Sequence, residues 1–395
     1  MWLFKFIIFA IPFFSLAWWI WADRRLKAMK VPGSWRVVFS LLLMVLLGGF
    51  TWILIARNQG FSVPIPAGLY ALVLLWGIIF LPMMGLPMMT GWAFWSLGRN
   101  LWKRSRTTPP VSLPEPAPGN VTRRRFLETS ALALPVISTF GATGICLPMT
   151  RKFRIRELTV SLPDLPEALD GIRIAQVSDA HVGKFTRGRM LREITDATNR
   201  LDADLVVLTG DLIDNTLNDL SSALEMVKGM DPRSGLFMVE GNHDLFDDPK
   251  EFVRRVRESG ITLLRNEAET VLIRGHAVQI MGITWDHHVA DMVANVDAVA
   301  KLRDPAAFPL LLAHHPHAFD AAAKHGLPLT LAGHTHGGQL MVGHELGVGP
   351  VMFKYWSGLY QKGPRALVVS NGVGNWFPLR TFAPAEIVHL TLRKA

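Results

Sequence analysis

The chain of 395 residues is long enough for two or three domains, and half of its residues are hydrophobic. Its single cysteine, Cys146, excludes an intrachain disulfide framework. Residues 1–150 carry 14 Lys and Arg against 3 Asp and Glu, whereas the remainder carries 27 against 29, so the basic excess is N-terminal. Because most of the 13 tryptophans also lie there, this charge favours a membrane partner over nucleic acid.

Three apolar runs near the N-terminus are each long enough to cross a bilayer, which takes about 20 residues. They cover residues 2–21, 37–56 and 70–97, and Pro82 and Pro87 interrupt the third run. Any one of them could be a buried helix of a soluble protein. Three in succession, with charges almost only between them (Lys5 lies near the start of the first), favour an all-α membrane region over residues 1–102.

A second kind of segment follows this region. Residues 103–122 contain five prolines and predict an extended linker. Arg123, Arg124 and Arg125 then precede a modest apolar run over residues 130–148. Residues 123–149 resemble a twin-arginine export signal, with Thr122 in the usual Ser position, although the charged flank of an ordinary membrane helix is the alternative. Because an internal export signal is unusual, we expect an uncleaved anchor.

The distribution of basic residues between the apolar runs predicts the orientation. The first and third loops are rich in Lys and Arg, whereas the second has only Arg57. Cytoplasmic loops carry the basic excess, so everything after about residue 150 is expected outside the membrane. Four basic residues count against this orientation, namely Arg151, Lys152, Arg154 and Arg156.

Residues 150–395 have the pattern of one soluble α/β domain. Short apolar runs alternate with amphipathic segments at 187–201, 220–230, 249–258 and 317–324. Five of these runs end in polar residues, and the ends of strands are where open α/β sheets form their sites. The polar ends are Ser178-Asp179-Ala180-His181, Gly210-Asp211, Gly241-Asn242-His243-Asp244, His314-His315-Pro316 and Gly333-His334-Thr335-His336.

The chemistry of these ends indicates a metal site. Carboxylate, imidazole and amide oxygen suit Mn, Fe, Zn or Co, and the set exceeds what one tetrahedral ion needs. Two ions about 3.5–4 Å apart would use it, with the central Asp211 as a bridge. Because metal-bound water ionises near neutral pH, the remaining need is a proton donor. His243 is the candidate, and the adjacent Asp244 could orient its ring or raise its pKa.

These five blocks, in order, resemble the signature of calcineurin-like metallophosphoesterases over about residues 155–392, and the tail 370–386 is similar to a bacterial membrane-associated phosphodiesterase branch. The resemblance implies a β-sandwich flanked by helices, with His243 facing the phosphate. It implies a first divalent metal held by Asp179, His181, Asp211 and His336, and a second held by Asp211, Asn242, His314 and His334. The family spacing His-x-Pro selects His314 over His315 and His317.

Two features stay open at this stage. The segment from Trp285 to His288 either lines a substrate pocket or forms a polar loop. Arg380 either contacts a substrate phosphate, whose geometry a guanidinium matches, or makes a structural ion pair.

The expected protein is a metal-dependent phosphoesterase in a bacterial inner membrane, with its catalytic domain on the periplasmic side. It would hydrolyse phosphodiester or pyrophosphate bonds, and a lipid-linked or envelope substrate follows from the tether. The alternative enzyme is a UDP-2,3-diacylglucosamine pyrophosphatase of lipid A synthesis. The alternative from another class is a non-catalytic scaffold or transporter-like protein, but no ligand position is lost and the three spans lack the buried charges of a transport pathway.

Overall fold

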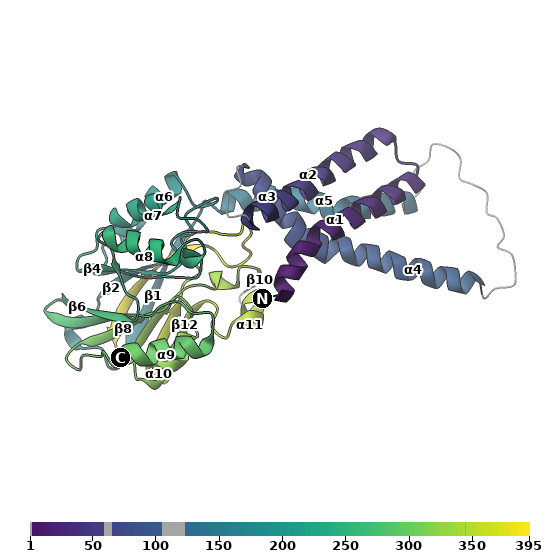
Figure 1. Ribbon diagram of the computed structural model, residues 1–395. Coiled ribbons are helices and arrows are strands. Elements are labelled where there is room, and N and C mark those ends of the chain that lie inside the picture. The colour runs from purple at the N-terminus through teal and green to yellow at the C-terminus, as the bar shows by residue number, and fades with distance from the viewer. Residues whose placement is uncertain (1, 59–64, 105–122, 344) are drawn as a thin grey trace. The chain divides into compact units, whose positions relative to one another are not determined.

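The computed structural model describes residues 2–58, 65–104, 123–343 and 345–395. These residues form two compact units, Met1–Leu147 and Pro148–Ala395 (Figure 1). The predicted proline-rich linker falls almost wholly on residues 105–122, which lie outside the described ranges together with His344.

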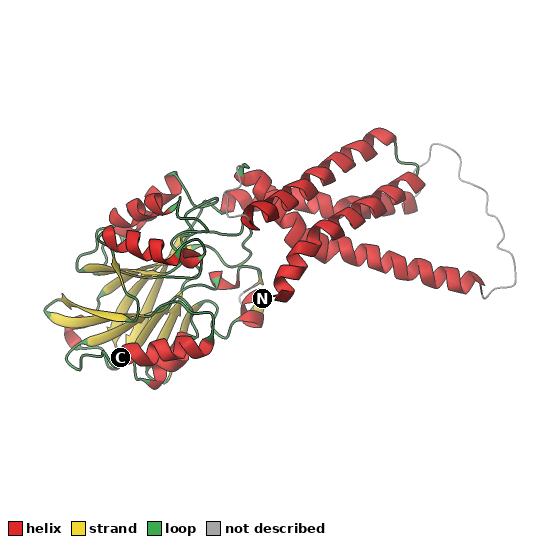
Figure 2. Ribbon diagram, in the orientation of Figure 1, coloured by secondary structure: helices red, strands yellow, loops and turns green. Residues whose placement is uncertain are grey.

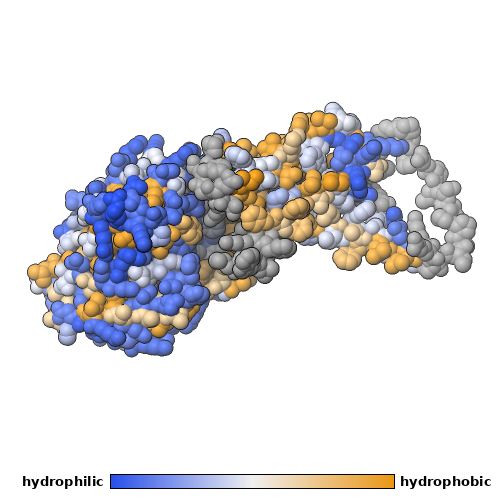
Figure 3. Space-filling model, in the orientation of Figure 1, coloured by the Kyte–Doolittle hydropathy of each residue, from blue (hydrophilic) through white to orange (hydrophobic). Residues whose placement is uncertain are grey.

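The first unit consists of helices packed around buried apolar side chains, and much of its visible surface is hydrophobic (Figure 3). Within the described ranges, three helical stretches are long and apolar enough to cross a membrane, namely Gly33–Ala56, Ala67–Trp102 and Phe126–Met149. They contain the apolar runs predicted at 37–56, 70–97 and 130–148. The run at 2–21 is helical too, although side chains before Phe9 are outside the description. The helices are α1 (Trp2–Ala28), α2 (Gly33–Asn58), α3 (Ala67–Leu75), η1 (Trp76–Gly85), α4 (Leu86–Arg104) and α5 (Arg123–Met149).

Pro82 does not end the third apolar stretch. Proline lacks an N–H and its ring clashes with the carbonyl four residues earlier, so it normally kinks or breaks an α-helix. Here it lies within the π-helical segment η1, whose wider turn changes the hydrogen-bonding partners. The chain from Ala67 to Trp102 therefore continues as one helical stretch of 36 residues.

The second unit contains two six-stranded mixed sheets. In each sheet the central strands are parallel, as in β2–β3–β4 and β7–β8–β9. The first sheet has the order β1 (Arg154–Leu162), β14 (Glu386–Lys394), β2 (Arg173–Val177), β3 (Leu205–Thr209), β4 (Gly235–Val239) and β5 (Thr262–Leu263). The second has the order β12 (Gly358–Lys362), β13 (Arg365–Val369), β9 (Leu329–Ala332), β8 (Phe308–Leu312), β7 (His276–Gly282) and β6 (Glu267–Ile273).

The two sheets pack face to face, and helices cover their outer faces (Figure 2). Strand β3 shows how the sequence produces these layers, because its side chains alternate between the two faces. Leu205 and Val207 enter the core between the sheets, whereas Val206 and Leu208 pack with the helices outside. This sandwich confirms the predicted fold class. The helices are α6 (Arg189–Arg200), α7 (Leu220–Lys228) and α8 (Pro249–Glu258) on the first sheet, and α9 (Val289–Ala300) and α10 (Ala318–Lys324) on the second.

Candidate metal centre

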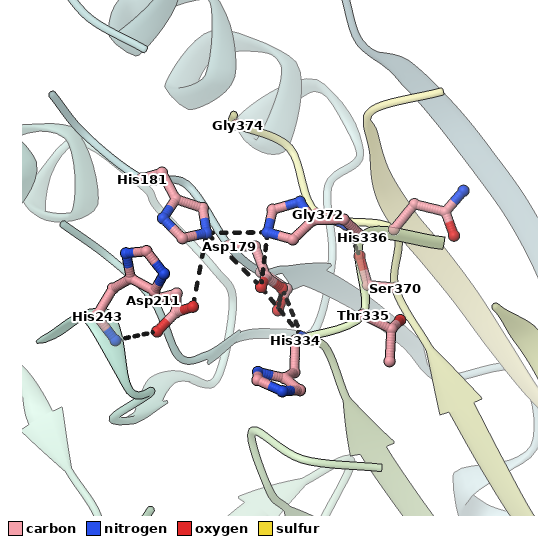
Figure 4. Close-up of polar contacts among 12 residues, drawn as sticks. Asp179, His181, Asp211, His243, His334, Thr335, His336, Ser370, Gly372 and Gly374 are labelled. Atoms are coloured by element: carbon pink, nitrogen blue, oxygen red, sulfur yellow. Dashed lines mark hydrogen bonds and ion pairs between the residues drawn. The ribbon is translucent and has the colours of Figure 1, made fainter. Parts of the chain in front are cut away.

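The polar strand ends of both sheets meet at one place in the second unit (Figure 4). Asp179 and His181 follow β2, Asp211 follows β3, and His334 and His336 follow β9. Ligand atoms lie within 4.8 Å of one another in three groups, which are Asp179 with His181 and His336, His181 with Asp211 and His243, and Asp211 with His314 and His334. Six of the seven predicted metal ligands are therefore brought together, and Asp211 belongs to two groups.

One carboxylate oxygen faces both of the predicted metal positions. Oδ2 of Asp211 lies 3.5 Å from Nε2 of His181 on one side and 3.2 Å from Nε2 of His314 on the other. Beyond them, Nε2 of His181 lies 2.9 Å from Nε2 of His336, and Nε2 of His314 lies 3.2 Å from Nδ1 of His334. Asp211 could therefore contribute to both of the predicted metal sites.

Asn242, the seventh predicted ligand, supplies an independent test of the fit. Its Oδ1 atom is buried, and no group in the described part of the chain hydrogen-bonds to it. A buried acceptor without a partner is costly, so such an atom needs an explanation. Asn242 immediately precedes His243, whose backbone N–H donates to Oδ1 of Asp211 at 2.8 Å. A cation beside Asp211 would use this oxygen, and the donor set therefore fits divalent metal ions.

Electrostatics acts differently on the individual predicted ligands. Burial would lower the pKa of His314, but the carboxylates of Asp211 and Asp179 outweigh it and raise that pKa to about 9. Burial alone would raise the pKa of Asp211, but His314 and neighbouring imidazoles outweigh it and hold that pKa well below its usual range. Burial, reinforced by the adjacent His314, lowers the pKa of His334 far below its ordinary value. Burial and the Arg380 guanidinium do the same to the pKa of His336. Both rings are thus uncharged at neutral pH, as metal ligands must be.

Several residues of the site share the same strained backbone conformation. Five site residues adopt the left-handed conformation, with φ of 51° at Asp179, 44° at His181, 54° at Asp211, 71° at His334 and 49° at His336. Non-glycine residues rarely do so, and each instance costs on the order of 1–3 kcal/mol. The tight turn that this conformation allows directly after a strand is what brings these side chains together above the sheet edge.

His243 is oriented by a residue that the sequence analysis did not identify. Its Nδ1 lies 2.5 Å from the backbone oxygen of Asp214 and 3.4 Å from the Asp214 carboxylate. A carbonyl can only accept, so Nδ1 donates and Nε2 is the nitrogen that titrates. Burial lowers the pKa of His243, but Asp211 and Asp214 outweigh it and raise that pKa above its usual value.

This geometry corrects the role predicted for Asp244. Its buried carboxylate accepts the backbone N–H groups of Ile213, at 3.0 Å, and Gly241, at 2.9 Å. Asp244 therefore fixes the two loops that carry Asp211 and His243, and the ring itself is held by Asp214. The sequence offered one sign of this role: Asp214 lies three residues after Asp211, in the same loop.

Arg380 makes structural contacts, as one of its two predicted roles required. Its partners, however, are not carboxylates. Its guanidinium donates to the backbone oxygens of Gly374, at 2.6 Å, and Asn371, at 2.8 Å, and to Oδ1 of Asn375, at 2.6 Å. It also lies 2.7 Å from Nδ1 of His336. The arginine thus ties the C-terminal loop 371–383 to a predicted metal ligand.

Aromatic side chains surround the centre. The Trp285 ring lies 4.9 Å from that of His334 and 5.3 Å from that of His314, so this part of the segment lies against two predicted ligands. His315 stacks on His334 at 4.7 Å but belongs to none of the ligand groups found among the described residues. Burial, then the neighbouring His317, lowers the pKa of His315 to about 3.

Comparison with known proteins identifies a domain within the C-terminal unit. Residues 172–338, which contain all seven predicted ligands, match the model of the calcineurin-like phosphoesterase family. The chain is 29% identical over 245 residues to an uncharacterized metallophosphoesterase of Helicobacter pylori (60% of this chain, 64% of that protein). It is 28% identical over 276 residues to a zebrafish (Danio rerio) transmembrane protein with a metallophosphoesterase domain (66% of this chain, 61% of that protein).

A third relative is matched along nearly its whole length. This uncharacterized metallophosphoesterase of Bacillus subtilis is 29% identical over 289 residues, which are 69% of this chain and 98% of that protein. By contrast, the chain spans less than two thirds of the first two relatives. The predicted strand-end ligands, the double sheet and these matches agree, and the C-terminal unit contains a calcineurin-like metallophosphoesterase domain.

Proposed function

We propose that this protein is a membrane-anchored phosphoesterase with two metal ions, which hydrolyses phosphodiester or pyrophosphate bonds. The observation that carries the proposal is the carboxylate of Asp211, whose Oδ2 faces His181 on one side and His314 on the other. The first ion would be held by Asp179, His181, Asp211 and His336, and the second by Asp211, Asn242, His314 and His334.

The proposed chemistry divides between the ions and the chain. Bound divalent ions would polarise the phosphate and provide hydroxide at neutral pH. The chain's own contribution is a proton for the leaving oxygen. His243 suits this role because its Nδ1 is committed to the backbone oxygen of Asp214, which leaves Nε2 to hold the proton. The nearby carboxylates of Asp211 and Asp214 stabilise the charged ring and raise its pKa.

The membrane part of the proposal rests on helix length and charge. Three described helical stretches are apolar enough to span a bilayer, and α5 leads directly into the phosphoesterase domain. Basic residues flank the predicted spans in the pattern that favours a bacterial inner membrane with the domain on the periplasmic side. In this proposal residues 1–102 are the membrane region, 103–122 the linker, 123–149 an uncleaved twin-arginine-like anchor and 150–395 the catalytic domain.

The alternatives are weaker. The names of the relatives give no support to a pyrophosphatase of lipid A synthesis. A degenerate scaffold is disfavoured because every predicted ligand position is filled by a residue that binds metal.

The activity is tested with the full chain in detergent micelles, stripped of metal and then given Mn, Zn, Fe or Mg in turn. A chromogenic phosphodiester and the matching monoester are the substrates. We expect metal-dependent diester cleavage that Asp211→Asn abolishes. Asp297→Asn is the matched control, because this half-exposed carboxylate lies on α9 and pairs with His325. A folded protein without turnover under any metal would favour the scaffold alternative.

The orientation has its own test. A reporter active only outside the cytoplasm and one active only inside are fused in turn to the C-terminus. Activity of the outside reporter is expected, and activity of the inside reporter alone would reverse the proposed topology.

A further inference from the structure

The phosphoesterase unit exposes large apolar side chains on one group of short elements. These are the hairpin of β10 (Met341–Val342) and β11 (Leu346–Gly347), and the helix α11 (Val348–Met352) that follows it. Val342 is 71% exposed, Leu346 68%, Val351 83%, Met352 64% and Phe382 67%. These five residues are called the apolar patch. Single exposed apolar residues are common in soluble proteins, but a contiguous group of this kind marks an interaction surface.

Hydrogen bonds join the elements of the apolar patch into one surface. Val342 and Leu346 are paired directly across the hairpin. The backbone N–H of Met341 donates to the backbone oxygen of Thr381 at 3.1 Å, which places Phe382 beside the hairpin. Helix α11 begins immediately after β11, and β10 and α11 lie close together in Figure 1.

The apolar patch borders the metal centre. The short helix η4 (His336–Gly338) begins at a predicted ligand, and the chain runs from it into β10. Gly338 packs against α11 so closely that a Cβ on it would lie 2.6 Å from the backbone nitrogen of Gly349. Trp376, 40% exposed, also borders the centre, with its ring 6.5 Å from that of His336 and 6.2 Å from that of His243.

The same region is tied to the point where the chain leaves its last apolar helix. Nδ2 of Asn375, next to Trp376, donates to the backbone oxygen of Thr150 at 3.0 Å. Thr150 directly follows Met149, the last residue of α5. If α5 spans the bilayer, its end lies at the bilayer surface. The hydrogen bond then holds the Trp376 loop at that surface, beside the exposed cations Arg151 and Lys152.

We infer that the apolar patch inserts into the bilayer that the chain's own helices span, so that the metal centre opens onto the layer of lipid headgroups. The inference rests on the membrane anchoring of the proposed function. A bilayer fits the observations better than a protein partner does, because a domain with an exposed apolar patch and with exposed Arg151 and Lys152 just after α5 matches acyl chains beneath anionic headgroups. The substrate class that follows is a phosphoester carried by an amphiphile in that leaflet.

The depth of the apolar patch can be measured directly. Since Cys146 is the only cysteine, the Cys146→Ala chain accepts a single nitroxide at an introduced cysteine. The full chain carrying Val351→Cys is reconstituted into vesicles of phosphatidylethanolamine and phosphatidylglycerol. Collisions of the label with oxygen, which concentrates in the bilayer, are compared with collisions with a water-soluble nickel chelate. Leu272→Cys is the matched control, because Leu272 on β6 is 70% exposed and lies outside the patch.

We expect the ratio of oxygen to nickel collisions to be several-fold higher at Val351→Cys than at Leu272→Cys. Equal ratios would overturn the inference. A label shielded from both reagents would also overturn it, because protein, from this chain or a second copy, would then cover the patch. Phe382→Cys gives an independent second reading should Val351→Cys fail to fold. Hydrolysis of a soluble diester in the same preparation tests the proposed activity separately, so the two failures are distinguishable.

Discussion

Replacing His243 with alanine tests the role that the geometry gives to this ring. The ring is fixed by the Asp214 backbone oxygen at 2.5 Å, and His243 belongs to the ligand group formed with His181 and Asp211. If His243 protonates the leaving oxygen, His243→Ala removes a general acid but leaves all seven predicted metal ligands in place. The loss of activity must then be larger for a substrate whose leaving group needs a proton than for one whose leaving group does not.

The size of the effect follows from this dependence. General acid catalysis contributes about 10²–10⁴-fold, which corresponds to roughly 3–5 kcal/mol of barrier. We expect His243→Ala to lose that much on a dialkyl phosphodiester, whose alkoxide leaves poorly. On a nitrophenyl diester, whose phenolate leaves without a proton, the loss is expected to stay below about tenfold. Asp214→Asn keeps the backbone oxygen that orients the ring, so its loss on the alkyl substrate is expected to be smaller.

The assay measures kcat for both substrates with the manganese-loaded full chain in micelles, together with the metal content of each variant. Equal losses on the two substrates, accompanied by lower metal content, would refute the acid role and make His243 a metal ligand. Unchanged activity on both substrates would refute the acid role and the metal-ligand role alike.

Glu386→Gln is expected to destabilise the protein by about 2–3 kcal/mol, because this fully buried carboxylate accepts Arg154 at 2.9 Å and Arg156 at 3.2 Å, and both arginines are partly solvated. Equilibrium unfolding in urea measures the change, and a value under about 0.5 kcal/mol would contradict it. Gly333→Ala is expected to weaken metal binding, since a Cβ there would overlap Oδ2 of Asp179. Equilibrium dialysis measures the affinity, which must fall for the prediction to hold. Chelation of the bound metal is expected to lower the unfolding temperature, because a ligand at 100 times its Kd stabilises the native state by about 2.7 kcal/mol. An identical calorimetric midpoint with and without chelator would argue against a metal centre.

The strands that carry the candidate site could be located from the sequence, because buried parallel strands are continuous apolar runs. The run predicted to end before Gly210 is β3, Leu205–Thr209, and the run before Asn242 ends with β4 at Val239. The pairing of β14 with β1 could not be predicted, since it joins Arg154 to Glu386 across 232 residues and no local pattern records it. Residue periodicity specifies which face of a strand is buried, not which strand lies beside it.

The residues expected to bind metal could be predicted from the sequence more completely than the residues that hold them in position. Asp179, His181 and Asp211 stood out because polar residues directly follow apolar runs. Asp214 did not, because its role depends on a backbone oxygen, which every residue has. The contacts of Arg380 could not be predicted either, since most of its acceptors are main-chain oxygens, which every residue has.

The position of the last strand has a consequence for synthesis of the protein. Strand β1 emerges from the ribosome directly after α5, but it stands at the edge of its sheet beside β14, whose Glu386 lies 232 residues after its partner Arg154. Until β14 is made, β1 has no neighbour in the sheet and β2, which leads into Asp179 and His181, keeps an open edge. Contacts of such sequence separation also form slowly. A chain that stops before β14 therefore lacks the strand that lies between β1 and β2, and the loop with the predicted ligands Asp179 and His181 then follows an open edge of the sheet.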